Sequence, residues 1–277
     1  MSGTNAEVEA IEIDLLLEGI FRRYGYDFRD YTRCTLERRM AHFASDAGCA
    51  TISEVTGRML HDTTFFHRLL PYFMVSVTSL FRDATFYAAL RSSVVPLLRT
   101  WPHFKIWHAG CATGEECYSM AIVLREAGLL RRARLYGTDI HAEALATAAS
   151  GIYPLDTVRE GSARYLESGG KGSLSDHYHA DANAAILNGA LGARITFAQH
   201  NLVTDQSFGE MQVVICRNVL IHFGLRLQDR ALALLAESLC PGGLLCLGES
   251  ETLMGTAVAD AFVAVDDRAR IYKKRVA

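Results

Sequence analysis

Two adjacent carboxylates follow a glycine-containing loop near the middle of the chain. An apolar run from Lys105 ends in a loop with Gly110 and Gly114, and a helix-like segment begins directly at Glu115 and Glu116. A strand, a tight glycine turn and a helix start are typical of a nucleotide-type site in a doubly wound sheet. A phosphate site would show cationic groups or bare amides at the helix start, and two carboxylates there would repel phosphate. The two carboxylates instead favour a ligand with an ammonium group. S-adenosylmethionine is such a ligand, because it combines a nucleoside, a sulfonium and an amino-acid end without any phosphate.

Three further residues are suitably placed to bind a nucleoside. Asp139 ends the second predicted strand, roughly 20 to 25 positions after the glycine loop, where doubly wound folds bind ribose hydroxyls. The alternative is an N-cap for the helix that begins near His141. Asn201 and Leu202 follow the third predicted strand, so that the amide can hydrogen-bond the adenine edge and the leucine can cover its face. Taken alone, this Asn-Leu pair is equally typical of a turn.

A polar pair follows the fourth predicted strand. Arg217 and Asn218 come directly after an apolar run, at the carboxyl edge of a parallel sheet, where ligands gather. A buried pair of this kind needs hydrogen-bonding partners. We expect a bound cofactor to supply them.

Alternating strands and helices must position these residues. Strands are predicted at 105–109, 134–138, 194–198, 211–216 and 243–248, with helices at 115–127, 141–150 and 225–239. This alternation predicts an α/β fold, with a doubly wound parallel sheet covered on both faces. The segment 262–275 holds Asp266 and Asp267 between two apolar stretches and is predicted to form a hairpin.

The remaining segments complete the predicted domain organisation. Residues 7 to about 75 show helical spacing, as in Ile13, Leu16, Leu17 and Ile20, and a helix is predicted from about 85 to 99. The stretch 152–193 is too long for a simple connection, so an inserted subdomain is predicted. The predicted boundaries are an all-helical domain at 1–78, a linker helix at 79–100, and a cofactor-binding domain at 101–277 with a small subdomain inserted at 152–193.

Composition argues against several classes of protein. The chain of 277 residues has a net charge of -3, which gives no general attraction to nucleic acid. No run approaches the roughly 18 apolar residues that span a membrane, and the polar, acidic start is unlike a signal peptide. Seven scattered cysteines without a Cys-x-x-Cys pair favour reduced thiols, a cytoplasmic location and no structural zinc. His177 and His179 are interpreted as part of a polar loop rather than a metal site.

Several motifs occur in a specific order and spacing along nearly the whole chain. They are YTR at 31–33, LERR at 36–39, VTSLFRD at 77–83, IWHAGCATGEE at 106–116, GIYP at 151–154, CRNVLIHF at 216–223 and PGGLLCLGESE at 241–251. Any one of them is weak. In this combination the chain resembles the chemotaxis receptor glutamate methyltransferases of the CheR type.

The resemblance implies a class I methyltransferase fold with an antiparallel terminal hairpin. It implies an enzyme that uses S-adenosylmethionine to O-methylate glutamate side chains of chemoreceptors, releasing S-adenosylhomocysteine without a metal. Together with Gly110 of the loop, the implied cofactor site comprises Thr78, Arg82, Glu115, Asp139, Asn201, Leu202, Arg217 and Asn218. Three positions depart from the family pattern: Ser76 stands where Asn is common and still offers a hydroxyl, Cys117 replaces Pro, and His222 replaces a Tyr that lies near the methyl group.

The chemistry of such an enzyme asks for alignment rather than for a base. A glutamate side chain has a reference pKa of about 4.3 and is already ionised at pH 7. The enzyme must align the carboxylate oxygen, methyl carbon and sulfur, and exclude water. Arg82 is the first candidate for a direct role, because its guanidinium can orient the cofactor carboxylate or the incoming glutamate; a surface ion pair is the alternative. His222 is the second candidate, either tuning the rate with pH or packing as an ordinary ring.

Partner recognition is predicted in the helical domain. Arg33, Arg38 and Arg39 concentrate positive charge there, which would attract the cytoplasmic, glutamate-bearing helices of methyl-accepting receptors; a solvated helix face is the alternative. In the family the insert can hold a tethering peptide, but the stretch 173–193 departs from the usual pattern. We expect a monomer without nucleic-acid or direct membrane contact. Two other functions stay open: the same reaction on another signalling protein, and a non-catalytic module that binds the cofactor and reports it to a partner.

Overall fold

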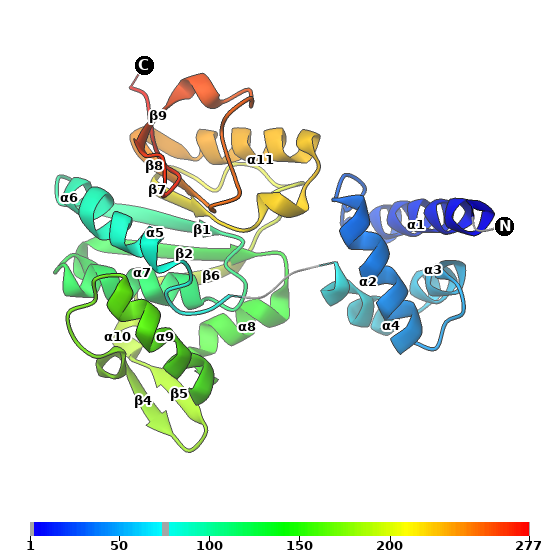
Figure 1. The fold of residues 1–277 in the computed structure, drawn as a ribbon, viewed down its shortest axis with the longest axis horizontal. Helices are drawn as coiled ribbons and strands as arrows, with labels where there is room; N and C mark the ends of the chain where they lie inside the picture. The colour runs from blue at the N-terminus through cyan, green and yellow to red at the C-terminus, as the bar shows by residue number, and fades with distance from the viewer. Residues whose placement is uncertain (1–2, 74–77, 277) are drawn as a thin grey trace. The chain divides into compact units, whose positions relative to one another are not determined.

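The chain is described by a computed structural model over residues 3–73 and 78–276. It divides into two units (Figure 1). The first comprises Met1–Val75 with Ile221–Gln228, and the second comprises Ser76–Leu220 with Asp229–Ala277. Each unit has a hydrophobic core of its own.

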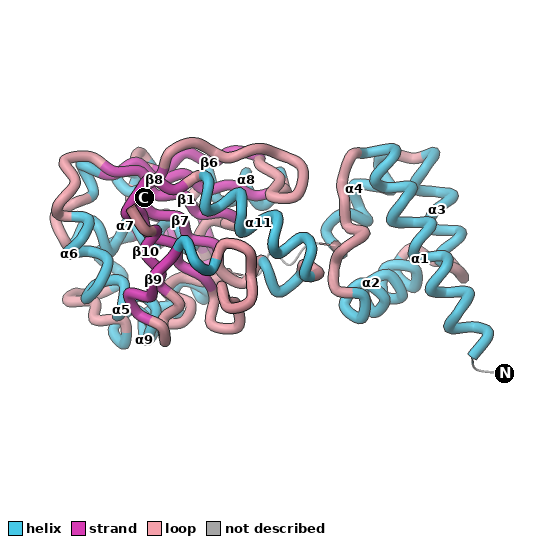
Figure 2. The backbone as a smooth tube through the Cα atoms, turned by 90° about the horizontal axis from the view of Figure 1, so that it is seen from above, coloured by secondary structure: helices cyan, strands magenta, loops and turns pink. Residues whose placement is uncertain are grey.

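The first unit is built from helices (Figure 2). They are α1 (Gly3–Tyr24), α2 (Arg33–Asp46), α3 (Ile52–His61) and α4 (Thr63–Leu69), followed by the 3-10 turn η1 (Leu70–Tyr72). The predicted apolar stripe of α1 is confirmed, because Ile13, Leu16 and Leu17 are buried in the core of this unit. Local capping fixes two helix starts, since the side chain of Thr51 accepts from the first turn of α3 and that of Asp62 from the first turn of α4.

The second unit is built on a seven-stranded sheet. Its strands are β1 (Phe104–Ala109), β2 (Ala133–Asp139), β6 (Ile195–Gln199), β7 (Met211–Cys216), β8 (Leu239–Leu247), β9 (Phe262–Asp266) and β10 (Ile271–Lys274). Their order is β6-β2-β1-β7-β8-β10-β9; the first five are parallel, and β10 is antiparallel to both its neighbours. The predicted parallel sheet with an antiparallel terminal hairpin is confirmed. From β1 the chain builds outward through β2 and β6 on one side and later through β7 and β8 on the other, so a ligand crevice is expected at the carboxyl ends of these strands.

Helices cover both faces of this sheet (Figures 1 and 2). They are α5 (Ala84–Ala89), the π-helical turn η2 (Leu90–Val94), α6 (Val95–Leu98), α7 (Glu115–Glu126), α8 (Ala142–Ser150) and the part of α11 (Leu225–Glu237) from Asp229 on, with short 3-10 turns η3 (Leu130–Arg132) and η6 (Ala259–Ala261). The 3-10 turn η5 (Leu220–His222) and the start of α11 fall where the chain passes between the two units. The helix predicted at 85–99 is thus interrupted by a wider turn. That turn immediately precedes α6, whose first turn contains Pro96, and proline has no N–H for an ordinary helical bond.

The stretch 152–193 forms a small sheet and helices of its own. Its elements are β3 (Ile152–Pro154), α9 (Leu155–Glu167), the 3-10 turn η4 (Leu174–His177), β4 (Tyr178–Asp181), β5 (Ala184–Leu187) and α10 (Gly189–Gly192), and the three strands pair antiparallel in the order β3-β5-β4. Tyr165, Leu174 and Leu191 are buried in the same core as the main sheet. A surface pocket of about 430 Å³ is lined by residues 152–154 and 181–184.

Candidate active site

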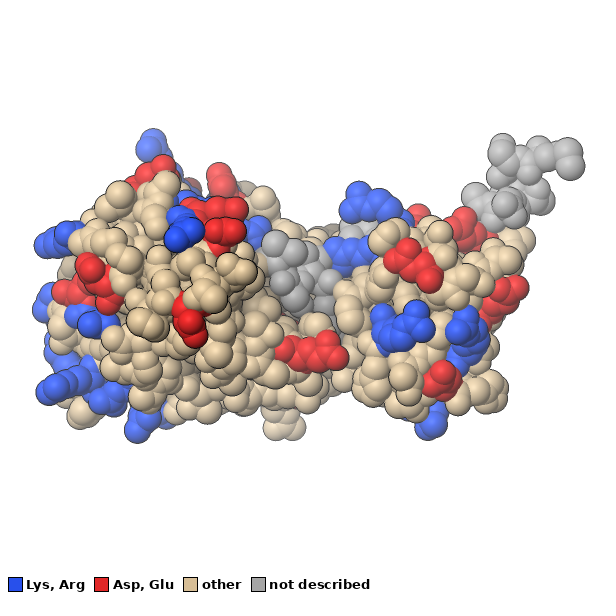
Figure 3. All heavy atoms as spheres, turned by 90° about the horizontal axis from the view of Figure 1, so that it is seen from below, with Lys and Arg blue, Asp and Glu red and all other residues tan. Residues whose placement is uncertain are grey.

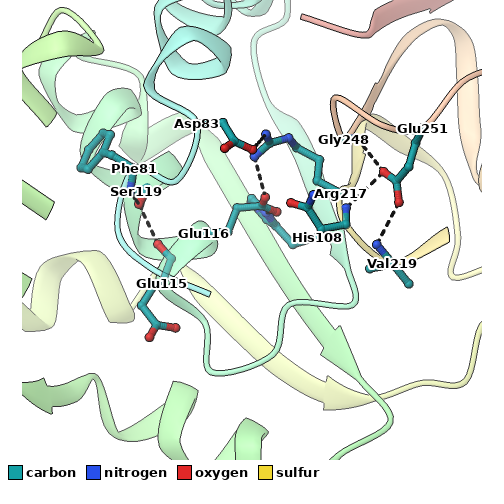
Figure 4. Close-up of polar contacts among 11 residues, drawn as sticks. Phe81, Asp83, His108, Glu115, Glu116, Ser119, Arg217, Val219, Gly248 and Glu251 are labelled. Atoms are coloured by element: carbon teal, nitrogen blue, oxygen red, sulfur yellow. Dashed lines mark hydrogen bonds and ion pairs between the residues drawn. The ribbon is translucent and has the colours of Figure 1, made fainter. Parts of the chain in front are cut away.

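The predicted cofactor residues of the second unit gather at the carboxyl ends of neighbouring parallel strands. Gly110 follows β1, Asp139 ends β2 and Arg217 follows β7. Gly248 follows β8, which lies next to β7. Because parallel strands all end at the same edge, residues far apart in the sequence come together there, and Figure 4 shows the polar contacts of Arg217 and Gly248.

The glycine loop is tied tightly to the strand beside it. The N–H groups of Gly110 and Cys111 both donate to the carbonyl of Thr138, at 2.8 and 2.9 Å. Gly110 has φ +77°, and a Cβ added to it would lie 2.4 Å from Cγ2 of Val219. Only glycine therefore allows the backbone to run this close to the segment after β7.

The carboxylate of Asp139 joins the loop to the end of β2. Its Oδ2 accepts from the N–H of Ala112 at 2.8 Å, and its Oδ1 accepts from the N–H of His141 at 3.0 Å. His141, rather than Asp139, occupies the N-cap position of α8. A carboxylate has about four acceptor positions, so these two bonds leave room for ribose hydroxyls, and the ribose role stays a prediction.

Glu115 begins α7 as a buried carboxylate, 5% exposed. Thr113 Oγ1 donates to its Oε2 at 2.7 Å. Burial raises the pKa of Glu115, and the hydrogen bond from Thr113 only partly opposes this. A buried carboxylate is stabilised in its ionised form by a positive partner, which is what the ammonium of S-adenosylmethionine would provide. The insert supports the same loop, because Tyr153 Oη donates to the carbonyl of Thr113 at 2.7 Å.

Glu116 faces a different set of partners from its neighbour. Its Oε1 lies 2.9 Å from Nδ1 of His108, and its Oε2 lies 3.3 Å from Nη1 of Arg217. Nη2 of Arg217 in turn donates to Oδ2 of Asp83 at 2.7 Å, and the guanidinium lies 3.9 Å from the ring centre of Phe86. Burial opposes ionisation of Glu116, but His108 and Arg217 outweigh it and lower the pKa of Glu116 below its ordinary value. The network is shown in Figure 4.

The surroundings of Arg217 correct one argument made from the sequence. We expected a bound cofactor to supply the partners of a buried Arg-Asn pair. The side chain of Arg217 is indeed buried, at 2% exposure, but Asp83 and Glu116 of the protein itself pair with its guanidinium. Its Nε is nevertheless buried without a hydrogen-bond partner among the described residues, so the protein meets only part of this need and the cofactor role of Arg217 stays a prediction.

A second buried carboxylate shapes the segment after β7. Oε1 of Glu251 accepts from the N–H groups of Val219 and Leu220 at 2.9 and 2.8 Å, and Oε2 accepts from those of Asn218 and Gly248 at 3.1 and 2.6 Å. Asn218 has φ +60°, a conformation that asparagine tolerates better than most residues. Sequence reasoning gave Glu251 no role of its own. The available signal was its position just beyond β8, at the same sheet edge as the other acidic residues.

The other predicted cofactor residues that the structure describes lie in loops of the second unit. Leu202 is buried, and Oδ1 of Asn201 accepts from the N–H of Val203 at 2.9 Å, so this side chain stabilises the local turn. The backbone N–H of Arg82 donates to the carbonyl of Ser79 at 3.3 Å. Thr78 is partly buried. Ser76 lies outside the described residues.

Four predicted residues belong to the first unit. The carbonyl of His222 accepts from the N–H of Thr32 at 3.0 Å, and its catalytic role stays a prediction. Arg33 is paired with Asp14 and, at 3.1 Å, with Glu37.

The other two docking candidates differ in exposure. Nη1 of Arg39 donates to the carbonyl of Phe73 at 3.3 Å, whereas Arg38 is exposed. Burial, with the nearby charge of Arg38, lowers the pKa of Arg39.

The fold and the site together define a class I methyltransferase that uses S-adenosylmethionine. A five-stranded parallel sheet ends in an antiparallel hairpin, and a glycine loop leads directly into a buried carboxylate. The family model described as "CheR methyltransferase, SAM binding domain" matches residues 76–269, and "CheR methyltransferase, all-alpha domain" matches residues 11–74. The chain belongs to the CheR methyltransferase family, which confirms the resemblance drawn from its motifs.

Individual relatives agree with this membership. A Pseudomonas putida protein named Cher3 is 46% identical over 264 residues, covering 95% of this chain and 97% of the relative. A "Chemotaxis protein methyltransferase" of Listeria monocytogenes is 27% identical over 243 residues, covering 85% of this chain and 88% of the relative. Among solved structures, a methyltransferase from Geobacter sulfurreducens in complex with S-adenosyl-L-homocysteine covers 61% of this chain and 49% of its own, at 18% identity and a TM-score of 0.35.

Two further properties concern metals and membranes. No cluster of three or more His, Cys, Asp and Glu side chains suited to a metal is found among residues 3–73 and 78–276. None of the helices described there combines the length and the apolar character needed to cross a membrane.

Proposed function

We propose that this chain transfers the methyl group of S-adenosylmethionine to glutamate side chains of chemoreceptor-like signalling proteins, forming glutamyl methyl esters. The observation that carries the proposal is the buried carboxylate of Glu115 directly after the glycine loop, where it can bind the ammonium of S-adenosylmethionine. The proposed acceptor does not require a catalytic base from the network of His108, Glu116 and Arg217. A carboxylate needs none, because it arrives ionised at neutral pH.

The chain's own residues would then bind, orient and shield. We assign the methionine ammonium to Glu115, the methionine carboxylate to Arg82 and the ribose to Asp139. Asn201 and Leu202 would contact the adenine, and the bound cofactor supplies the electrophilic methyl group. Proposed members of this site are also Ser76, Thr78, Gly110, Arg217 and Asn218. His222 is a proposed neighbour of the reacting groups.

Receptor docking is proposed for the helical unit, with Arg38 as its main contact. Arg33 pairs with carboxylates of the protein and Arg39 donates to a backbone carbonyl. Both side chains therefore stabilise the surface around Arg38 and are less available to a partner. Figure 3 shows Lys and Arg intermingled with Asp and Glu on this unit, which lies on the right of that view. A mixed surface favours a local, oriented contact with acidic helices over general attraction. We further propose that the enzyme acts in the cytoplasm as a monomer.

The proposal is tested by following the methyl group. Purified protein, tritiated S-adenosylmethionine and membranes from the source cells should give label on receptor-sized proteins. That label should be released as methanol by mild base, and mass spectrometry should map it to glutamate. At a low concentration of S-adenosylmethionine, Asp139→Ala should strongly reduce the label, while Asp267→Ala, the same change at an exposed position, should not. Base-stable label would exclude carboxyl esters.

The same experiment separates the rival functions. Base-labile label on a protein other than a receptor would replace the proposed substrate while keeping the reaction. Cofactor binding without label in any membrane or cytosolic fraction would favour a non-catalytic module. The relative named as a chemotaxis protein methyltransferase supports the receptor as substrate.

A further inference from the structure

The turn that carries Arg82 has an unusual backbone. Phe81 on one side has φ +55° and Asp83 on the other has φ +58°. Residues other than glycine rarely adopt this left-handed region, and a bulky, fully buried phenylalanine there is an outlier. Such conformations persist only where the surrounding structure over-determines them. The contacts of this turn therefore need to account for its shape.

One hydroxyl joins this turn to α7, the helix that begins with Glu115 and Glu116. Oγ of Ser119, on α7, accepts from the N–H of Phe81 at 3.0 Å and donates to the carbonyl of Glu115 at 2.7 Å (Figure 4). Ser119 is completely buried. It therefore links the backbone beside Arg82 directly to the backbone of Glu115.

An ion pair fixes the other end of the turn. Asp83 occupies the N-cap position of α5, yet its side chain makes no capping bond. An N-cap aspartate usually satisfies N–H groups of the first turn. Here the carboxylate pairs with Arg217, which is also held by Glu116. A third contact comes from the insert, since Nε of Arg164 on α9 donates to the carbonyl of Leu80 at 3.1 Å.

We propose that Ser119 and the Asp83–Arg217 pair are positioning residues that set the separation between Arg82 and Glu115. The inference rests on the proposed function, in which these two charges bind the carboxylate and the ammonium of the cofactor's amino-acid end. A zwitterion with fixed spacing is bound well only if both partners are held at matching positions. The left-handed turn places Arg82, and the two anchors keep it there against the strain.

The test measures binding of two ligands that differ only in the recognised part. S-adenosylhomocysteine has the amino-acid end, and 5'-methylthioadenosine has the same nucleoside without it. In titration calorimetry, Ser119→Ala and Asp83→Asn should each lower the affinity for S-adenosylhomocysteine about tenfold, in keeping with the loss of one hydrogen-bonded contact. Affinity for 5'-methylthioadenosine should stay unchanged. Asn is chosen at 83 because it tolerates φ +58° while removing the charge.

A double-variant cycle adds a second criterion. In an Arg82→Ala background, Ser119→Ala should cost nothing further, because the group that it positions is gone. Ser45→Ala, the same change at an exposed helical serine of the first unit, should match the unmodified protein. Asp83→Asn serves as the second variant should Ser119→Ala fold poorly, since Asp83 is partly exposed.

The outcomes distinguish a failure of the positioning role from a failure of the proposed cofactor binding by Arg82. If Arg82→Ala weakens S-adenosylhomocysteine but Ser119→Ala and Asp83→Asn do not, the inference is overturned and the cofactor role of Arg82 stands. Equal losses for both ligands would mean general disruption and would also overturn it. If Arg82→Ala changes nothing, both the assignment of Arg82 and the positioning role fall.

Discussion

Replacing Glu251 by glutamine should destabilise the second unit strongly for so small a change. The two carboxylate oxygens accept four backbone N–H bonds at 2.6 to 3.1 Å, and the side chain is buried. In glutamine one oxygen becomes an NH₂ group, which donates and cannot accept. Two of the four N–H groups therefore lose their acceptor in a place that water does not reach.

The expected loss of stability follows from these two orphaned donors. Each buried donor without a partner costs about 1–3 kcal/mol, so two cost roughly 2–6 kcal/mol. Burial raises the pKa of Glu251, while its backbone hydrogen bonds lower it, so the charge itself is costly here. Removing that charge returns part of the loss, and we expect a net loss of about 2–3 kcal/mol.

Urea unfolding measures this loss in the right part of the molecule. The chain has two tryptophans, Trp101 and Trp107, and both lie in the second unit, so their fluorescence reports its unfolding. With a slope of about 2 kcal/mol per M urea, the midpoint should fall by about 1 M.

The neighbouring residue Glu249 provides the matched control. It is exposed, so Glu249→Gln removes the same charge without disturbing buried donors. We expect its free energy of unfolding to change by no more than about 0.5 kcal/mol, as for ordinary surface changes, which shifts the midpoint by no more than about 0.25 M. If Glu251→Gln is no more destabilising than Glu249→Gln, the four bonds do not hold the segment after β7 and the reasoning is refuted.

Three further predictions concern the loop, the ribose and pH. Gly110→Ala places a Cβ 2.4 Å from Val219 at φ +77° and should weaken S-adenosylhomocysteine binding at least about tenfold, as measured by calorimetry. Adding Val219→Ala should restore part of this affinity. Wild-type affinity of the single variant would contradict the close approach. Asp139→Ala should lower the affinity for the same ligand about 10- to 100-fold, and unchanged affinity would contradict the assignment of Asp139 to the ribose. Burial lowers the pKa of His177 below its ordinary value of 6.5, so the unfolded chain binds this proton more readily. Stability of the second unit should therefore fall as the pH drops below about 6.5, and urea midpoints across pH should change less for His177→Gln; an equal slope in both proteins would disprove the effect.

Much of the architecture was readable from local pattern. Apolar runs marked the parallel strands, which are buried on both faces, and helical spacing marked the helices between them, so each element could be predicted separately. The wider turn before Pro96 was missed, since the apolar spacing continues through it. The small sheet of the insert was also unclear, because β3, β4 and β5 are short and their pairing depends on contacts outside each strand.

The site was predicted as a set of residues but not as a set of contacts. Arg217 pairs with Asp83, which lies 134 positions earlier, and with Glu116, which lies 101 positions earlier. Such partners become neighbours only because β7 lies beside β1 in the sheet. No local spacing encodes that adjacency, and this is why the partners of Arg217 were expected from a ligand.

The two adjacent carboxylates, Glu115 and Glu116, show what the sequence determines and what depends on the tertiary structure. Their position after a glycine loop was sufficient to predict a site for a nucleoside with a positive end. Their roles were not separable by sequence, because both are glutamates at the same helix start. Successive helical residues point about 100° apart, so Glu115 is enclosed with Thr113 while Glu116 reaches His108 and Arg217. The sequence by itself determined that two carboxylates stand at this helix start, and only the packing of β1, β7 and α7 decided that Glu116 pairs with His108 and Arg217 while Glu115 is enclosed with Thr113.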